Sequence, residues 1–349
     1  MQKTDLATPL LSWFDKSKRV LPFRTLSTPY RVWVSEIMLQ QTRVSAVLPY
    51  FERFMTALPT IADLAACEAE PLQKLWEGLG YYSRVHNLQK AARIVMAEYG
   101  GALPADFAAL QTLPGIGAYT AGAIASICFH LPVVAVDGNV LRVFARVLNC
   151  DGDILQPDVK KFLSAAVQAA QPPARCGDYN EALMELGALV CVPNGAPLCA
   201  ECPLCDLCAA QKAGTQSTLP HKTPKKARKA LDYTVALLVC GHRVLLEQRP
   251  QSGLLAGLWQ PILLDGTLDA AETVAALAKR GFACSVIAPL PPAKHIFTHL
   301  TWQMTGFLCD ASEFSLPSGF AFASADDIEN VYAIPNAFKV YKNELVKLL

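Results

Sequence analysis

The chain has 349 residues, of which 52% are hydrophobic and 17% are charged, and its formal net charge is +1. This length and composition suit two domains with buried cores and exclude an intrinsically disordered chain. The longest apolar run, residues 121–136, is shorter than the roughly 20 residues that a membrane span needs, and the first residues lack an apolar signal segment, so we expect a cytoplasmic protein.

The first 208 residues are predicted to form an all-α domain. Apolar residues recur every three to four positions in 29–42, 46–58, 71–100 and 178–191, and Gly or Pro residues separate these segments. Up to Lys229 the chain has 23 Lys and Arg against 19 Asp and Glu. This small basic excess permits DNA binding, but ordinary solvated surfaces show such a bias as well.

Glu36 lies on the helix expected at 29–42. Its neighbours three or four positions away include Val32, Trp33 and Leu39, so the carboxylate projects from a largely apolar face. Burial raises the pKa of a carboxyl group and allows it to donate a proton near neutral pH. A glutamate on a half-buried helix edge would show the same spacing, so the sequence leaves both interpretations open.

Residues 113–127, LPGIGAYTAGAIASI, predict two helices joined by a tight Pro-Gly-x-Gly turn. The amides that open the second helix could bind a phosphate, although a simple helix–helix turn is the alternative. Asp137, in VDGNV, is expected at another helix start, where it could be no more than an N-cap. The hairpin followed about twenty residues later by VDGNV resembles the helix–hairpin–helix DNA glycosylases, and the resemblance implies that Asp137, as an anion, could stabilise the positive charge that grows on a deoxyribose as its base departs. One acid and one anion, here Glu36 and Asp137, are what removal of a purine requires.

Five of the twelve cysteines fall within residues 191–208. The spacing Cys191-x7-Cys199-x2-Cys202-x5-Cys208 suits an iron–sulfur cluster or structural zinc, which spacing cannot distinguish, and Cys205 is additional. Disulfides are not expected in a chain without an export signal.

Residues 209–231 are predicted to form a linker, with five basic residues between Lys222 and Lys229. This linker could follow a phosphate backbone or be merely solvated. Residues 232–349 are predicted to form an α+β domain. TVALLVC and RVLLEQR form a hairpin around Gly241–His242, AAETVAALAKRGF is a helix, and SVIAPL and TWQMTGFLC are strands.

Several motifs together resemble the MutY-type adenine DNA glycosylases of the helix–hairpin–helix superfamily. In chain order they are LPFR, PYRVWVSEIMLQQT, GLGYY, LPGIGAYTAGA, VDGNV and YNEALMELGALVC. Further along, GLLAGLWQP and HIFTH resemble the Nudix-like C-terminal domain of the same family. The resemblance implies a multidomain protein: an all-α helix–hairpin–helix domain with an iron–sulfur loop, then a smaller α+β Nudix-like domain. The helix AETVAALAKRG lacks the paired glutamates of a Nudix box, so no Mg²⁺ site is expected.

The resemblance also implies roles for individual residues. Glu36 protonates adenine at N7, and Asp137 stabilises or transiently bonds the sugar carbon, with support from Tyr119 and Asn139. The adenine pocket comprises Arg24, Leu39, Val44 and Glu181. Contacts beside the partner base 8-oxoguanine come from Gln41, Thr42, Leu79, Tyr81, Thr298 and His299. The hairpin that grips DNA includes Leu113, Gly115 and Gly117. The ligands of a [4Fe–4S] cluster are Cys191, Cys199, Cys202 and Cys208.

The function implied is hydrolytic removal of adenine mispaired with 8-oxoguanine or guanine in double-stranded DNA, by a nucleoid-associated monomer. Related strand-cutting enzymes carry a lysine where this chain has Tyr119, and some family members carry one at Leu141, so strand cutting is not expected. Phe23 replaces the usual tryptophan of LPWR, and the first cysteine spacing is one residue longer than usual. Three alternatives are less favoured: a bifunctional glycosylase-lyase, a non-catalytic iron–sulfur DNA-binding protein, and a nucleotide pyrophosphatase.

Overall fold

The computed structural model describes residues 5–224, 227–312 and 315–348, which form two compact units. The first unit comprises Met1–Ala66 and His86–Lys225, and the second comprises Cys67–Val85 and Lys226–Leu349. The segment 67–85 therefore belongs to the second unit, although the sequence places it among the helices of the first. None of the helices in the described ranges is long and apolar enough to cross a membrane.

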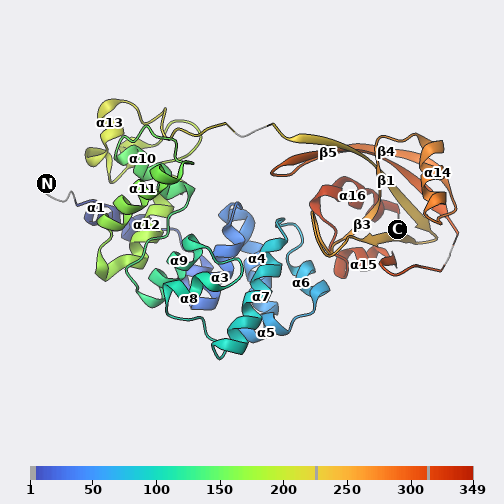
Figure 1. The fold of residues 1–349 in the computed structure, drawn as a ribbon, viewed down its shortest axis with the longest axis horizontal. Helices are drawn as coiled ribbons and strands as arrows, with labels where there is room; N and C mark the ends of the chain where they lie inside the picture. The colour runs from blue at the N-terminus through green and yellow to red at the C-terminus, as the bar shows by residue number, and fades with distance from the viewer. Residues whose placement is uncertain (1–4, 225–226, 313–314, 349) are drawn as a thin grey trace. The chain divides into compact units, whose positions relative to one another are not determined.

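The first unit is all-α, as predicted (Figure 1). Its helices are α1 (Ala7–Ser17), α2 (Pro22–Thr25), α3 (Pro29–Leu39), α4 (Val44–Ala57), α5 (Ile61–Ala66), α7 (Ser83–Glu98, whose start lies in the second unit), α8 (Phe107–Thr112), α9 (Ala118–Phe129), α10 (Gly138–Val147), α11 (Pro157–Ala170), α12 (Cys176–Leu189) and α13 (Ala209–Ala213). Short 3₁₀ turns occur at Pro173–Arg175, Cys199–Glu201 and Cys205–Leu207.

One core of this unit lies between α1, α10, α11 and α12, through side chains such as Phe14, Phe144, Leu163 and Leu183. Two of these helices come unusually close at Gly187 of α12. A Cβ atom there would lie 2.7 Å from the Cβ of Asn139 on α10, so no larger residue fits without a shift. This close approach sets α12 directly against the start of α10, where Asp137 lies.

The predicted helix–hairpin–helix is formed by α8, α9 and the turn between them. Gly115 has a φ of 80°, a left-handed conformation that favours glycine, and a Cβ there would lie 2.9 Å from the Cβ of Asn87. Leu113 is buried beneath the turn, and Gly117 caps α9 with extended backbone. The turn thus leaves the first amides of α9 at its surface.

The predicted linker 209–231 is more ordered than expected. Helix α13 lies within it, Leu219 is buried, and the Leu219 carbonyl accepts a hydrogen bond of 2.9 Å from Arg146 Nε. The His221 carbonyl accepts one of 3.1 Å from the Ile154 amide. Residues 209–221 therefore pack on the first unit instead of extending freely. Lys225 and Lys226 of the basic run lie outside the described residues, while Arg228 and Lys229 are exposed.

The second unit is α+β, as predicted, and contains a six-stranded mixed sheet. The strands are β1 (Lys229–Cys240), β2 (Arg243–Gln248), β3 (Trp259–Asp265), β4 (Cys284–Ile296), β5 (Leu300–Ala311) and β6 (Phe320–Ala323), in the order β4-β5-β1-β3-β2-β6. β1 and β2 form the expected hairpin, in which Cys240 pairs with Arg243, and β1 runs parallel to β5. The helices are α6 (Ala69–Leu75), α14 (Ala270–Lys279), α15 (Ala325–Asn330) and α16 (Lys339–Leu348), with a 3₁₀ turn at Asn336–Phe338.

Both faces of this sheet are covered. Alternate residues of β1 enter different cores: Val235 and Leu237 pack with Tyr341 of α16, whereas Ala236 and Leu238 pack with Leu277 of α14. This two-residue period is the strand pattern expected when helices cover both faces of a sheet.

Candidate active site and cysteine loop

A cavity of about 640 Å³ in the first unit is bordered by residues of α2, α3, α4, α9, α10 and α12. It brings together the following predicted residues: Arg24, Glu36, Leu39, Gln41, Thr42, Val44, Tyr119, Asp137, Asn139 and Glu181. Residues that the sequence did not single out also line it: Arg19, Ser35, Arg43, Met184 and Glu185. A cavity of this size accommodates a ligand as large as a purine base.

Glu36 is 7% exposed on α3, a helix that begins at Pro29 after the capping residue Thr28. Burial raises the pKa of its carboxyl group to about 7, helped by the charges of Asp137 and Glu181 and opposed by the Tyr119 hydroxyl and Arg24. The buried Oε2 atom has no hydrogen-bond partner in the described part of the chain. Such a carboxyl group can keep its proton near neutral pH and has an atom available for a ligand.

Asp137 caps the N-terminus of α10. Its Oδ1 accepts hydrogen bonds of 2.8 Å from the amides of Asn139 and Val140, and its Oδ2 accepts one of 2.7 Å from Asn139 Nδ2. These donors to both oxygens, at the positive end of a helix, hold the side chain in one orientation. The same helix holds this arrangement, because Arg142 Nη2 donates 2.9 Å to Asn139 Oδ1 and Arg142 Nε donates 2.8 Å to the Cys191 carbonyl.

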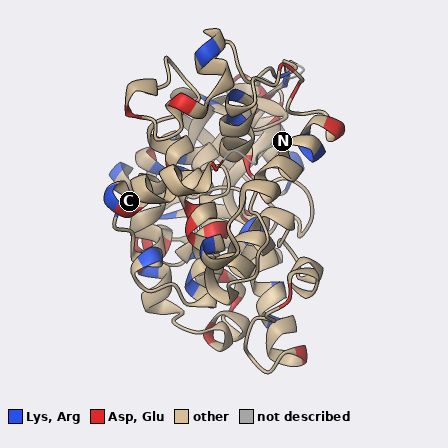
Figure 2. Cartoon of the chain, turned by 90° about the vertical axis from the view of Figure 1, so that its left-hand side faces the viewer, with Lys and Arg blue, Asp and Glu red and all other residues tan. Residues whose placement is uncertain are grey.

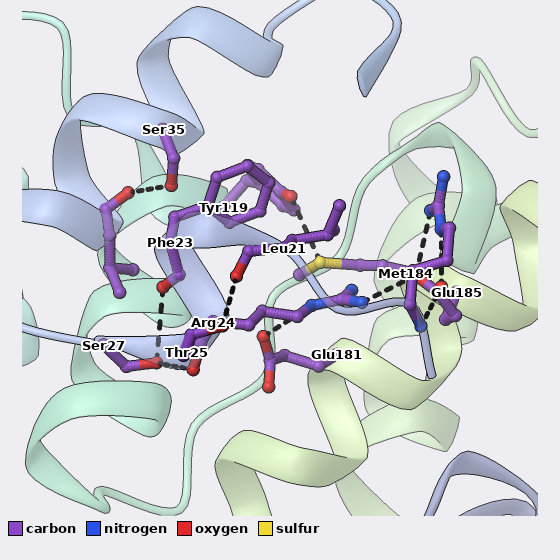
Figure 3. A network of polar contacts seen from close by, with 12 residues as sticks. Leu21, Phe23, Arg24, Thr25, Ser27, Ser35, Tyr119, Glu181, Met184 and Glu185 are labelled. Atoms are coloured by element: carbon purple, nitrogen blue, oxygen red, sulfur yellow. Dashed lines mark hydrogen bonds and ion pairs between the residues drawn. The ribbon is translucent and has the colours of Figure 1, made fainter. Parts of the chain in front are cut away.

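Tyr119 lies in the first turn of α9, and its hydroxyl donates to Met184 Sδ at 3.4 Å (Figure 3). Burial, together with the charges of Glu36 and Asp137, raises the pKa of Tyr119 well above its ordinary value. The phenol therefore stays neutral and is a poor nucleophile.

An ion-pair network on α12 forms another part of the wall (Figure 3). Arg24 Nε lies 3.0 Å from Glu181 Oε1, and Arg24 Nη1 lies 2.9 Å from Glu185 Oε2. Arg19 Nε reaches Glu185 Oε1 at 2.6 Å. Burial opposes the charge of Glu185, but the hydrogen bonds from Arg19 and the charge of Arg24 outweigh it and lower the pKa of Glu185. The four-residue spacing of Glu181 and Glu185 on a predicted helix was the available signal for this second carboxylate.

Four predicted residues lie in the second unit. The hydroxyls of Tyr81 and Thr298 lie 3.1 Å apart, which joins two segments separated by 217 positions. Tyr81 is 46% exposed, and Thr298 and His299 are also exposed, whereas Leu79 is 7% exposed. Tyr81 is therefore better placed than Leu79 to contact a ligand.

All five loop cysteines line one small cavity in the first unit, of about 30 Å³. Arg146 Nη1 donates to Cys191 Sγ at 3.2 Å, a charge that suits a thiolate ligand. The sulfurs are close enough to influence each other: burial, then the charges of Cys191, Cys208 and Cys199, raise the pKa of Cys202 to about 12. No group of three or more His, Cys, Asp or Glu side chains in the described ranges is arranged to hold a single metal ion.

The distribution of charged residues does not mark a DNA-binding surface in the view of Figure 2. In the view of Figure 2, Lys and Arg residues are interspersed with Asp and Glu.

Comparison with known proteins identifies both parts of the chain. Residues 34–169 match the family of HhH-GPD superfamily base excision DNA repair proteins, and residues 234–343 match the NUDIX domain. The adenine DNA glycosylase of Mus musculus is 37% identical over 97% of this chain and 78% of its own. That of Homo sapiens is 35% identical over 96% of this chain and 73% of its own. A solved structure of a thermostable thymine-DNA glycosylase is 26% identical with a TM-score of 0.53, and the match covers 59% of this chain and 94% of that one.

Proposed function

Since this chain belongs to the adenine DNA glycosylases of base excision repair, we propose that it removes adenine mispaired with 8-oxoguanine or guanine from double-stranded DNA, by hydrolysis and without cutting the strand. The observation that carries the mechanism is the pair of carboxylates with opposite environments, Glu36 and Asp137, in one cavity. We propose that the chain acts as a monomer.

In the proposed reaction, adenine is flipped out of the duplex into the cavity. Glu36 donates its proton to N7 of the base, for which its raised pKa makes it suitable. The bond between C1′ of the sugar and N9 then breaks, and its electron pair leaves with the protonated base.

Asp137 faces the positive charge left on the sugar. Because hydrogen bonds from Asn139 and Val140 hold its carboxylate in place, it can stabilise the oxocarbenium-like state without reorganising. A water molecule supplies the oxygen that finally bonds to C1′ and returns a proton to Glu36. Tyr119 offers no amine, so no Schiff base that would lead to strand cutting can form there.

DNA is proposed to lie against the α8–α9 turn, where the amides that follow Gly115 and Gly117 contact a phosphate. Tyr81 enters the base stack, and Gln41 and Thr42 contact the neighbouring bases. The Tyr81 ring would compensate for the stacking that is lost when adenine leaves the helix. The buried Leu79 supports the loop that carries it.

Thr298 and His299 are proposed to recognise the partner base. Both are exposed, and both can hydrogen-bond to the N7–H and O8 edge that distinguishes 8-oxoguanine from guanine. The helix α14 carries Glu272 without the second acid of a paired metal site, so a binding role suits the domain better than pyrophosphate hydrolysis.

Cys191, Cys199, Cys202 and Cys208 are proposed to hold a [4Fe–4S] cluster. The four thiols come from one short loop and line a single cavity, which suits an iron–sulfur cluster. The bound group would act as a structural crosslink of the loop, and Arg146 would balance the charge at Cys191.

The proposed function is tested with four labelled duplexes that carry adenine opposite 8-oxoguanine, guanine, cytosine or thymine. We expect excision opposite the first two, seen as strand breaks only after alkali treatment. Equal excision opposite all four partners, or breaks without alkali, would contradict the proposal.

A further inference from the structure

The loop that carries Tyr81 has an unusual backbone. Gly78 and Gly80 have φ values of 101° and 69°, and Tyr81, which has a side chain, has a φ of 48°. A side-chain-bearing residue in the left-handed region costs on the order of 1–3 kcal/mol, so such a conformation persists only where surrounding contacts impose it.

One set of contacts comes from Arg84, at the start of α7, and from Trp76, which precedes the loop. Arg84 Nη2 donates hydrogen bonds of 3.1 Å to the carbonyls of Leu79 and Gly80, and its guanidinium lies 5.5 Å from the centre of the Tyr81 ring. Trp76 Nε1 also donates 3.1 Å to the Gly80 carbonyl. These contacts hold the C-terminal half of the loop.

The N-terminal half of the loop is held by residues far along the chain in the same unit. Asn336 Nδ2 donates 2.9 Å to the Gly78 carbonyl. Glu77 Oε1 accepts 2.6 Å from Lys342 Nζ and 3.2 Å from the Ile334 amide.

Glu77 is the centre of a small charge cluster. Its Oε2 atom lies 2.5 Å from Lys74 Nζ, which also donates to the carbonyls of Ile328 and Tyr332 at 2.9 and 3.2 Å. The side chains of Glu77 and Lys342 are only 15% and 26% exposed, so salt screens their attraction less than at an open surface. The cluster therefore resists displacement of the loop.

We propose that Glu77, Asn336 and Lys342 are positioning residues, which hold the Gly78–Tyr81 loop in the conformation that admits Tyr81 into DNA. The segment that includes Asn336 and Lys342 thereby controls base unstacking, a step that precedes recognition of the partner base by Thr298 and His299. This inference rests on the role proposed above for Tyr81.

The test uses the full chain and two variants, Lys342→Met and Asn336→Ala. Lys339→Met and Asn330→Ala are matched controls, because both residues are exposed and lie on the neighbouring helices α16 and α15. A 2-aminopurine next to the target adenine reports unstacking by its fluorescence, and single-turnover excision is measured opposite 8-oxoguanine and opposite guanine.

We expect Lys342→Met and Asn336→Ala to lower the unstacking rate and excision roughly tenfold on both duplexes, since a small misplacement of a positioned group costs this much or more. The preference for 8-oxoguanine should change less than twofold, and Lys342→Arg should restore the rate. Thermal melting identifies a variant that fails to fold. If Lys342→Met does not fold, the inference is tested by Asn336→Ala alone, which removes one exposed contact.

Normal unstacking in Asn336→Ala would overturn the inference, as would a loss confined to the 8-oxoguanine duplex. Failure of the unmodified chain to excise adenine from either duplex would instead overturn the proposed function.

Discussion

Glu36 and Asp137 line the same cavity, yet one has a buried oxygen without a hydrogen-bond partner among the described residues and the other has donors on both oxygens. This difference in hydrogen bonding arises from the positions of the two residues on their helices. Glu36 projects from the middle of an apolar helix face, whereas Asp137 occupies a helix start with free amides. Two chemically similar groups are thereby suited to opposite tasks, proton donation and stabilisation of positive charge.

Replacement of the acid tests this assignment. Glu36→Gln keeps the size of the side chain but removes the proton, so single-turnover excision should fall by about two orders of magnitude or more while duplex binding survives. The excision rate of the unmodified chain should fall as pH rises through about 7, because Glu36 loses its proton there. Near-normal excision by Glu36→Gln would remove Glu36 from the mechanism. Glu52→Gln, at an exposed position of α4, is the control.

The same raised pKa predicts a pH-dependent stability. Below pH 4.5 Glu36 is protonated in both the folded and unfolded chain, and between 4.5 and about 7 only the unfolded chain loses the proton. Stability therefore falls as pH rises through this range, by about 3 kcal/mol for a shift of this size. Glu36→Gln should lack this loss. The free energy of unfolding of the variant should therefore rise relative to that of the unmodified chain between pH 4 and pH 8. The free energies of unfolding are measured by denaturant titration at pH 4 and pH 8. The same difference between the two proteins at both pH values would contradict the prediction.

Sequence patterns predicted the features of the site that depend on neighbouring residues along the chain. The burial of Glu36 follows from Val32 and Trp33 nearby on the helix, and the capping role of Asp137 follows from its place before a helix. The pairing of Arg19 with Glu185 could not be predicted, because these residues are 166 positions apart and only the packing of α1 on α12 brings them together.

For the same reason the contacts of residues 67–85 with the second unit could not be predicted. Helical periodicity shows which face of α6 is apolar, but it does not show that Lys74 and Glu77 pair with backbone and side chains more than 250 positions later. Long-range partners of charged residues leave no periodic signal.

Strand cutting is tested by trapping. Because Tyr119 has no amine and its hydroxyl stays neutral, borohydride should trap little covalent protein–DNA complex. Tyr119→Lys places an amine in the cavity and should give a trapped complex and nicks without alkali. Efficient trapping by the unmodified chain would show a nucleophilic amine elsewhere and contradict hydrolysis.

The cysteine assignment is tested by metal content. Protein purified anaerobically should be brown, with about four irons per chain. Cys202→Ser should lose the iron, whereas Cys205→Ser should keep it, and Cys150→Ser, outside the loop, is the control. Loss of iron from Cys205→Ser with retention in Cys202→Ser would show that the ligand set is wrong. Zinc without iron in the unmodified chain would contradict the cluster.

Recognition of the partner base is tested by changing Thr298 and His299 separately. Each replacement, Thr298→Val or His299→Ala, removes one hydrogen-bonding group from the edge that would face 8-oxoguanine. Loss of one such contact costs about 1–3 kcal/mol, so excision opposite 8-oxoguanine should fall roughly tenfold, while excision opposite guanine should change little.

The contact between Thr298 and Tyr81 requires a further comparison, because Thr298→Val also removes the hydroxyl that lies 3.1 Å from Tyr81. Tyr81→Phe removes the same contact and leaves Thr298 free to bind the base. If Thr298 recognises 8-oxoguanine, Tyr81→Phe should keep most of the preference that Thr298→Val loses. Equal loss in both variants would mean that Thr298 acts by orienting Tyr81. His242→Ala, exposed in the β1–β2 turn, controls for removal of a surface histidine. An equal fall opposite both partner bases in His299→Ala would contradict its role in recognition.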